Sequence, residues 1–369
     1  MSPKEDRRLL RGHLWAYRNE FQQLPTLEDG ALVDVFTASG RFVGRGFYQA
    51  DGGIAVRLLS RRQEEIGQDF FAQRIAQARS FRERLFPGSD TWRWIHAESD
   101  GFPGLVADRY GALVVLKTSC AFYAQSADVI AGALLAEPGV SGVVLNAGER
   151  VQAYGSVPEE LTVGLGGVAL SVNVRSAQKT GLFLDQRLNA EGIRPFCPGA
   201  RVLDGHCYAG AWSCTAARAG AAAVLGVDTS AAAIDAARAN ARRNNAEGVC
   251  RFECAPVEEV LARGEGYDVV ILDPPAFAKT RGSRAKALAR YHALNAAAMR
   301  AVLPGGVLVT CSCSHFIDPA GFTEMLKRAA TAARRKALLL DLRGAAPDHP
   351  VLMAMPETAY LKCATVRLL

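Results

Sequence analysis

The sequence predicts an α/β protein whose C-terminal half contains a doubly wound parallel sheet, and three observations support this fold class. Residues 201–228 show the pattern strand, glycine-containing turn, helix and second strand, which is half of a nucleotide-binding unit. Two further apolar runs, 269–272 and 307–310, have the length and composition of buried parallel strands. The first 65 residues instead contain short strands separated by turns, so we expect a β-rich domain before the sheet.

The composition is that of an ordinary globular protein with room for two or three domains. The chain has 369 residues, of which 49% are hydrophobic and 22% charged, and a formal net charge of +6. This mild positive charge permits an anionic partner such as RNA. No apolar run is long enough to cross a membrane, so we expect a cytoplasmic protein with reduced thiols and no membrane partner. The nine cysteines lack a zinc-binding spacing, so no metal is expected.

The N-terminal region, residues 1–65, is predicted to form a small β-rich domain. Residues 31–36 and 41–48 form a hairpin pattern around Ser39-Gly40, and 54–59 is a third strand. Arginines precede the aromatic segment 13–17, a mixture that suits contacts with nucleotides and phosphates; they are Arg7, Arg8 and Arg11. The alternative for Trp15 is that it anchors the small β core.

Residues 66–175 are predicted to form a second, mixed α+β domain, and residues 176–369 a third. The period of the apolar residues predicts a helix over 68–85, which Pro87-Gly88 ends. Strands at 92–96, 105–117 and 142–146 and a helix at 124–136 complete the middle domain. The boundary near residues 171–178 is placed where the strand pattern gives way to polar sequence.

The turn after the first C-terminal strand predicts the type of ligand. It carries Asp204 where dinucleotide-binding turns have phosphate-facing glycines, and a carboxylate there would repel a pyrophosphate. The same carboxylate suits a cationic ligand such as S-adenosylmethionine, whereas a dinucleotide site and an empty structural turn remain alternatives. Gly205 and Gly210 are expected where backbone approaches the ligand closely, and Asp228 is expected to accept hydrogen bonds from ribose hydroxyls.

The remaining elements of this third domain follow in order. Thr229-Ser230 can cap a helix that runs to about Asn244. The strand at 269–272 ends in Asp273-Pro274-Pro275, which places a rigid loop at the ligand-binding edge of the sheet. The following basic residues suit either a solvated loop or phosphate contact; they are Lys279, Arg281, Arg284, Lys286 and Arg290. Helices at 291–303 and 320–335, and final strands at 351–355 and 359–368, complete a predicted seven-stranded sheet.

Several separated segments together resemble one family, the bacterial ribosomal RNA cytosine-C5 methyltransferases of the RlmI type. The matching segments span nearly the whole chain and are H-L-W-A-Y, E-S-D-G-F-P-G-L-V-A-D-R-Y-G, Q-K-T-G-L-F-L-D-Q-R, D-P-P-A-F, T-C-S-C-S and D-H-P…Y-L-K. The resemblance implies an N-terminal PUA domain, a middle β-rich domain and a Rossmann-like class I methyltransferase domain. It also implies S-adenosylmethionine as methyl donor and a 23S rRNA cytosine, naked or in a large-subunit precursor, as acceptor. It leaves a homodimer possible.

The resemblance also assigns roles to individual residues. The cysteine of S-C-S, Cys313, is implied as the nucleophile, because a thiolate that adds to carbon 6 of cytosine activates carbon 5. Cys311 is a competitor if the strand is regular, since residues i and i+2 share a face, or it is a small core residue. Asp273 is the candidate proton acceptor. The cofactor site is expected to include Asp204, Gly205, Tyr208, Gly210, Asp228, Thr229, Asp273, Gln186 and Arg187.

Alternatives remain open at the level of the sequence. Base-nitrogen methyltransferases use [DN]-P-P-[YF], and Phe277 is displaced by one residue from that pattern. An RNA-binding or ribosome-assembly factor could retain the fold without turnover. A dehydrogenase is disfavoured, because the turn lacks the pyrophosphate-binding glycines. Residues 185–187 fit either the start of a surface helix or a ligand-facing segment.

Overall fold

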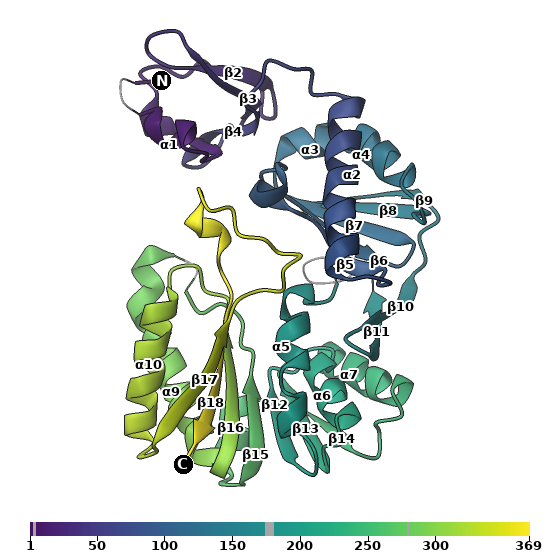
Figure 1. Ribbon diagram of the computed structural model, residues 1–369, viewed down its shortest axis with the longest axis vertical. Helices are drawn as coiled ribbons and strands as arrows, with labels where there is room; N and C mark the ends of the chain where they lie inside the picture. Colours follow the sequence, from purple (N-terminus) through teal and green to yellow (C-terminus); the bar gives the residue numbers. More distant parts are fainter. Residues whose placement is uncertain (3–4, 174–180, 279) are drawn as a thin grey trace. The chain divides into compact units, whose positions relative to one another are not determined.

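The computed structural model describes residues 1–2, 5–173, 181–278 and 280–369, and these fall into two compact units. Unit 1 contains residues 1–161, 172–182 and 347–358, and unit 2 contains residues 162–171, 183–346 and 359–369. The predicted boundary between residues 175 and 176 and the predicted loop residue Lys279 lie outside the described residues. Figure 1 shows the elements of both units.

Unit 1 begins with a four-stranded antiparallel sheet in the order β1-β4-β3-β2. Its elements are α1 (Arg7–Leu10), β1 (Trp15–Tyr17), η1 (Arg18–Glu20), β2 (Leu32–Phe36), β3 (Phe42–Tyr48) and β4 (Ile54–Ser60). The predicted hairpin is confirmed, because β2 pairs with β3 in antiparallel register around the left-handed Gly40. Gly46 lies where a side chain could not fit, since its Cβ would be 2.1 Å from the Arg57 carbonyl oxygen.

The second sheet of unit 1 is mixed, in the order β5-β6-β7-β8-β9. Its strands are β5 (Thr91–His96), β6 (Leu105–Tyr110), β7 (Leu113–Thr118), β8 (Gly142–Ala147) and β9 (Arg150–Gly155), and its helices are α2 (Gln68–Leu85), η2 (Ala97–Asp100), α3 (Ala121–Gln125) and α4 (Ala127–Leu135). The predicted helix over 68–85 is confirmed. Its buried face carries Phe71, Ile75 and Ala78, which pack with Trp92 and Trp94 in one apolar cluster.

Residues 347–358 belong to unit 1 although they follow most of unit 2 in the sequence. Asp348 is fully buried and accepts hydrogen bonds from the Arg93 backbone N–H at 2.9 Å and from His349 at 2.8 Å. Its carbonyl accepts from Arg82, whose guanidinium also forms a bidentate pair with Asp100 at 2.6 and 2.7 Å. The segment is therefore held by buried charged hydrogen bonds. The short helix η6 (Pro356–Thr358) ends it.

Unit 2 is built on a seven-stranded sheet in the order β14-β13-β12-β15-β16-β18-β17, which confirms the predicted strand number. Its strands are β12 (Arg201–Gly205), β13 (Ala223–Asp228), β14 (Cys250–Cys254), β15 (Tyr267–Leu272), β16 (Val302–Ser312), β17 (Ala337–Arg343) and β18 (Lys362–Leu368). Strands β12 to β16 pair in parallel, whereas β18 is antiparallel to both β16 and β17. The predicted strand at 351–355 is wrong: those residues form turns in unit 1, and β17 is the partner of β18.

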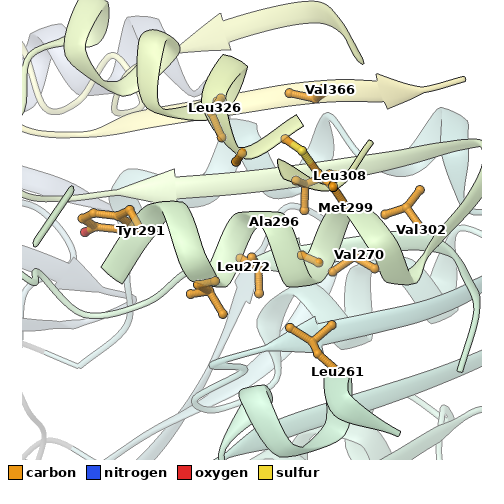
Figure 2. Close-up of a cluster of buried hydrophobic side chains, with 14 of the residues drawn as sticks. Leu261, Val270, Leu272, Tyr291, Ala296, Met299, Val302, Leu308, Leu326 and Val366 are labelled. Carbon is orange, nitrogen blue, oxygen red and sulfur yellow. The ribbon is translucent and has the colours of Figure 1, made fainter. Parts of the chain in front are cut away.

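Helices cover both faces of this sheet (Figure 1). They are α5 (Arg187–Glu191), α6 (Ala211–Arg218), α7 (Ala231–Arg243), α8 (Val257–Ala262), α9 (Arg284–Ala301) and α10 (Pro319–Ala332), with short 3₁₀ turns η3 (Leu184–Gln186), η4 (Arg194–Phe196) and η5 (Arg281–Ser283). One apolar cluster joins α8, α9 and α10 to the sheet (Figure 2), and a second contains residues of α6 and α7. The two clusters place the C-terminal fold in the doubly wound class.

A two-stranded hairpin, β10 (Glu160–Leu165) and β11 (Val168–Asn173), was not predicted. Two asparagines hydrogen-bond the backbone of β11: Asn240, which lies in α7, and Asn244, which caps the C-terminus of that helix. Asn244 exchanges two bonds with Ala169, at 2.9 and 2.7 Å, and Asn240 accepts from the Ser171 N–H at 2.9 Å. These contacts satisfy backbone groups that a strand edge would otherwise leave unpaired, which explains polar side chains on the inner face of a helix.

Candidate active site

Four predicted site residues lie at the same edge of the sheet of unit 2. Asp204 is in β12, Asp228 ends β13, Asp273 follows β15, and Cys313 follows β16. Because these strands are parallel, their carboxyl ends meet at this edge. β12 and β15 are neighbours although β13 and β14 lie between them in the sequence, so the order of strands reverses there. Ligands of doubly wound sheets bind at such a switch point.

Asp204 is a fully buried carboxyl group with spare hydrogen-bonding capacity. Ser213 Oγ donates to its Oδ2 at 2.6 Å, whereas Oδ1 has no hydrogen-bond partner among the described residues. Burial raises the pKa of Asp204 to about 7, Ser213 opposes this shift, and the charge of Asp273 adds to it. A buried oxygen of this kind fits a cationic N–H donor, so the residues present fit the ammonium group of S-adenosylmethionine.

The turn from 206 to 210 has an unusual backbone conformation. His206 and Tyr208 have φ of 63° and 48°, in the left-handed region that residues with a Cβ rarely occupy. The Tyr208 N–H donates to Asp228 Oδ2 at 3.1 Å, and its ring meets Phe183 edge-on at 5.2 Å. These contacts hold Tyr208 between the ends of β12 and β13.

Gly205 and Gly210 are both crowded by the protein itself. A Cβ at Gly205 would lie 2.7 Å from Val257 Cγ2, and one at Gly210 would lie 3.0 Å from Ala237 Cβ. Gly210 also has φ of +77° at the start of α6. Packing against neighbouring elements is therefore sufficient to require glycine at both positions, and a role beside the ligand remains a prediction.

Asp228 organises the start of α7 while staying partly exposed. It accepts from the Ser230 N–H at 2.9 Å, and Ser230 in turn caps the helix by accepting from the Ala233 N–H at 3.3 Å. Thr229, beside it, is exposed, and its carbonyl oxygen accepts from Cys254 Sγ at 3.5 Å. Each carboxylate oxygen retains a lone pair, so Asp228 can also accept from a ligand hydroxyl.

The segment 185–187 is buried, so its interpretation as the start of a surface helix is wrong. Asp185, Gln186 and Arg187 are only 5%, 4% and 6% exposed. Tyr360 donates its hydroxyl to Asp185 Oδ2 at 2.6 Å. Gln186 accepts from Asn189 Nδ2 at 2.7 Å and hydrogen-bonds the thiol of Cys311. Gln186 is thus fixed against the strand that leads to Cys313.

The two cysteines of the T-C-S-C-S segment lie in different environments. Cys311 is fully buried in an apolar cluster beside Cys363, and burial raises its pKa well above the usual value for a thiol. Cys313 follows the last residue of β16 and is half-buried, although Ser312 and Ser314 on either side are fully buried. The structure thus places Cys311 in the core, and Cys313 is the accessible thiol of this segment.

Two residues beside Cys313 were missed by the sequence analysis. Tyr291 of α9 is fully buried, and its hydroxyl lies 3.2 Å from Ser314 Oγ; Figure 2 shows the ring at one end of the apolar cluster. Lys362, the first residue of β18, donates from Nζ to the carbonyl oxygens of Ser314 and Tyr360, both at 2.7 Å. The Y-L-K segment was noted as part of the resemblance, but nothing in the local pattern connects it to Cys313.

The loop after β15 contains Asp273 and the aromatic ring of Phe277. Asp273 is half-buried, and its N–H donates to the Gly205 carbonyl at 3.3 Å, which links the ends of β15 and β12. The Phe277 ring contacts Tyr291, with centroids 4.5 Å apart, and lies 4.0 Å below the guanidinium of Arg290. The prediction of a loop across the basic residues is wrong from Arg284 onward, because α9 begins there.

The N-terminal aromatic segment is part of a polar network in unit 1. Trp15 Nε1 donates to Glu98 Oε1 at 2.9 Å, and Arg57 also pairs with Glu98 at 3.1 Å. Arg8 pairs with Glu20 at 2.7 Å. Trp15 and Arg8 therefore have partners within the protein, whereas Arg7 and Arg11 are exposed.

The described residues provide neither a metal site nor a membrane-spanning helix. Within the described ranges, no cluster of histidine, cysteine or acidic side chains has the arrangement of a metal site. No described helix combines the length and apolar character needed to span a bilayer. A surface hollow between α9, α10 and β17 is lined by residues such as Met299, Leu326 and Leu339 and contains none of the predicted site residues.

Comparisons with known proteins identify a family for each end of the chain. Residues 1–61 match the model of a PUA-like domain, and residues 147–351 match that of S-adenosylmethionine-dependent methyltransferases. The ribosomal RNA large subunit methyltransferase I of Aeromonas hydrophila is 34% identical over 384 residues, covering 98% of this chain and 97% of the relative. The protein of the same name from Shewanella amazonensis is 34% identical over 399 residues, covering 100% and 98%.

Solved structures show the same fold over the full length. A putative S-adenosylmethionine-dependent methyltransferase from Streptococcus mutans has a TM-score of 0.86 at 20% identity and covers 98% of this chain and 97% of its own. A putative methyltransferase solved with S-adenosylhomocysteine has a TM-score of 0.88 at 21% identity, with the same coverage.

The fold and the carboxyl edge of its sheet define an S-adenosylmethionine-dependent methyltransferase preceded by a PUA-like domain. The two relatives are about one-third identical to this chain over nearly the full length of both, and they identify one family within this class. The chain belongs to the family of ribosomal RNA large subunit methyltransferase I.

Proposed function

We propose that this enzyme methylates carbon 5 of a cytosine in the 23S RNA of the large ribosomal subunit, through a covalent adduct with Cys313. The observation that carries the proposal is the position of Cys313. It is a half-buried thiol at the carboxyl end of β16, one strand away from Asp273, at the edge where doubly wound sheets bind ligands. The relatives named for large-subunit ribosomal RNA support the choice of substrate, and a cytoplasmic location follows from it.

The residues that would hold the cofactor lie at the carboxyl ends of β12, β13 and β15. S-adenosylmethionine supplies an electrophilic methyl group on a sulfonium. Asp204 Oδ1, which has no partner among the described residues, would accept from its ammonium group, and Asp228 would accept from its ribose. Tyr208, Thr229, Gln186 and Arg187 complete the surroundings, together with the turn from Gly205 to Gly210.

The protein's residues then act in sequence on the cytosine, which must leave its stack to reach the site. The Cys313 thiolate donates an electron pair to carbon 6, forming the S–C6 bond while the C5=C6 π electrons move to carbon 5. The bound donor would supply its methyl group to carbon 5, and its sulfur would keep the electron pair of the broken bond. Asp273, the candidate base, removes the proton from carbon 5. The C5=C6 bond re-forms, and the S–C6 electron pair returns to Cys313.

The adduct provides the sharpest test, because fluorine at carbon 5 cannot leave as a proton. With RNA that contains 5-fluorocytosine, the wild-type enzyme is expected to form a complex that survives denaturing electrophoresis. Cys313→Ala should lose the complex and at least about 100-fold in kcat. Cys311→Ala, a matched change in the core, should retain both. Turnover by Cys313→Ala would overturn the mechanism, and a labelled product other than 5-methylcytosine would overturn the substrate assignment.

The competing function, methylation of a base nitrogen, requires no cysteine adduct and would use Phe277 for stacking. That ring already contacts Tyr291 and Arg290.

Calorimetric titration tests the binding of the cofactor separately. Asp204→Asn is expected to weaken S-adenosylmethionine about 10- to 100-fold, because a charged hydrogen bond is worth about 1.5–3 kcal/mol. Unchanged affinity would remove Asp204 from the site.

A further inference from the structure

Lys362 is a buried cation at the edge of the sheet where Cys313 lies. Strands β16 and β18 are antiparallel, and Ser312, the last residue of β16, is the register partner of Lys362, the first residue of β18. Cys313 is the next residue along the chain. The end of one strand and the start of the other therefore bring the thiol and the lysine together.

The hydrogen bonds of Lys362 leave its charge uncompensated. The side chain is 4% exposed, and Nζ donates to two neutral carbonyl oxygens, those of Ser314 and Tyr360. In the described part of the chain, no carboxylate lies within ion-pair distance of Nζ. An ammonium group has three N–H donors, so one remains, together with a full positive charge in a poorly solvated place.

Two ionisable groups favour the charged form of Lys362, and Cys313 has the larger effect. Burial lowers the pKa of Lys362 to about 8, and the opposing effects come first from Cys313 and then from Asp318. Asp318 is largely exposed, where it caps α10 through Gly321. Tyr291 faces the same thiol from α9, and burial raises the pKa of its hydroxyl.

We propose that Lys362 is a positioning residue that holds Cys313 as a thiolate, ready to attack carbon 6. The proposal rests on the function proposed above for Cys313. An adjacent cation is the usual way in which proteins make a thiol nucleophilic near neutral pH. The two carbonyl oxygens fix the ammonium in place, so the lysine acts as a fixed charge at the end of β16, next to the cysteine in the chain. The thiol proton passes to solvent, and the lysine keeps its own proton throughout the reaction.

The test measures the thiol directly, in the full-length protein without cofactor or RNA. The rate of alkylation of Cys313 by iodoacetamide is followed against pH by peptide mass spectrometry. Exposed Cys254 in the same protein serves as the internal control. Lys362→Met should raise the midpoint of the Cys313 profile by about one pH unit or more, because a nearby opposite charge shifts a pKa by this amount. Lys362→Arg should restore a low midpoint.

A second neutral variant distinguishes the loss of charge from a folding defect. Lys362→Gln keeps a donor for one carbonyl oxygen but carries no charge, and it should shift the midpoint as Lys362→Met does. In methyl transfer, both neutral variants should lower kcat at neutral pH, with recovery at higher pH and little change in KM for RNA. An unchanged Cys313 midpoint in both neutral variants would overturn the proposal, as would a rise in KM alone. The alkylation profile tests the role of Lys362 separately from the adduct mechanism. Activity retained by Cys313→Ala would refute the adduct, but it would leave the alkylation profile of Cys313 in the wild type unchanged.

Discussion

At the scale of single residues, Asp204 couples the stability of the cofactor-free protein to pH. Its pKa is raised by burial to about 7, from about 3.9 in an unfolded chain. Between these values the folded protein holds a proton that the unfolded chain has lost. The resulting stabilisation is complete below about pH 4 and disappears as the pH rises through 7.

We therefore expect Asp204→Asn to flatten this pH dependence. The fall in Tm between pH 5 and pH 7.5, measured without cofactor, should be smaller in Asp204→Asn than in the wild type. Asp235→Asn, on the exposed side of α7, should behave like the wild type. Equal falls in Tm for Asp204→Asn and the wild type would contradict the assignment.

Residue positions could be predicted from the sequence where the pattern is local. They could not be predicted where the register between two distant strands determines them. The position of Asp204 in β12 could be predicted, because the strand–turn–helix pattern is local, and its contact with the ligand remains a prediction. The resemblance favoured Cys313, but the strand pattern alone did not separate it from Cys311, because the strand ends at Ser312 and no local signal marks that end. Lys362 meets the Ser314 carbonyl across 48 residues of sequence. Only the register of β16 and β18 reveals that contact.

At the scale of elements, two glycines in helical regions should respond in opposite directions to alanine. Gly210→Ala places a Cβ at φ of +77° and 3.0 Å from Ala237 Cβ, so we expect a loss of about 1–2 kcal/mol. Gly132 lies on the exposed side of α4, and a Cβ added there would meet no atom within 4 Å, so Gly132→Ala should gain about 0.5–1 kcal/mol.

Urea unfolding of the two variants measures both changes. The midpoint should fall for Gly210→Ala and rise for Gly132→Ala, with similar slopes. A neutral result for Gly210→Ala would show that the turn before α6 can rearrange. In that event the left-handed backbone of His206 and Tyr208 would not be fixed by their surroundings.

Two elements differ from the prediction because their local composition is typical of another structure. The charges of the basic residues before Tyr291 suit a solvated loop or phosphate contact, yet alanine, arginine and lysine are good helix formers, and α9 begins at Arg284. Val351, Leu352 and Met353 form an apolar run typical of a strand. Prolines 350 and 356 bracket that run, and Met353 is 94% exposed. Its backbone is held in unit 1 by partners that are distant in sequence.

At the scale of the whole molecule, Asp348 is expected to secure the distant segment of unit 1. Asp348→Ala would leave the Arg93 N–H and His349 without their buried acceptor. We expect a loss of about 2–4 kcal/mol, the range for breaking a buried network. Met353→Ala, in the same segment but 94% exposed, should have no effect.

The measurement is urea unfolding followed by tryptophan fluorescence, since three of the four tryptophans, Trp15, Trp92 and Trp94, belong to unit 1, whereas Trp212 belongs to unit 2. Asp348→Ala should lower the midpoint of this signal, while S-adenosylmethionine still binds unit 2. An unchanged midpoint would mean that the buried carboxylate contributes nothing to holding the segment.

The late position of this segment also determines when unit 1 can finish folding during synthesis. Residues 1–161 leave the ribosome first, but their last partner, 347–358, is made only after the roughly 160 residues of unit 2 between 183 and 346. At about 5–20 residues per second, this delay lasts about 10–30 s. Through that interval the nascent N-terminal half lacks Asp348, which accepts from Arg82 and from the Arg93 N–H, until nearly all of the methyltransferase sheet has been translated.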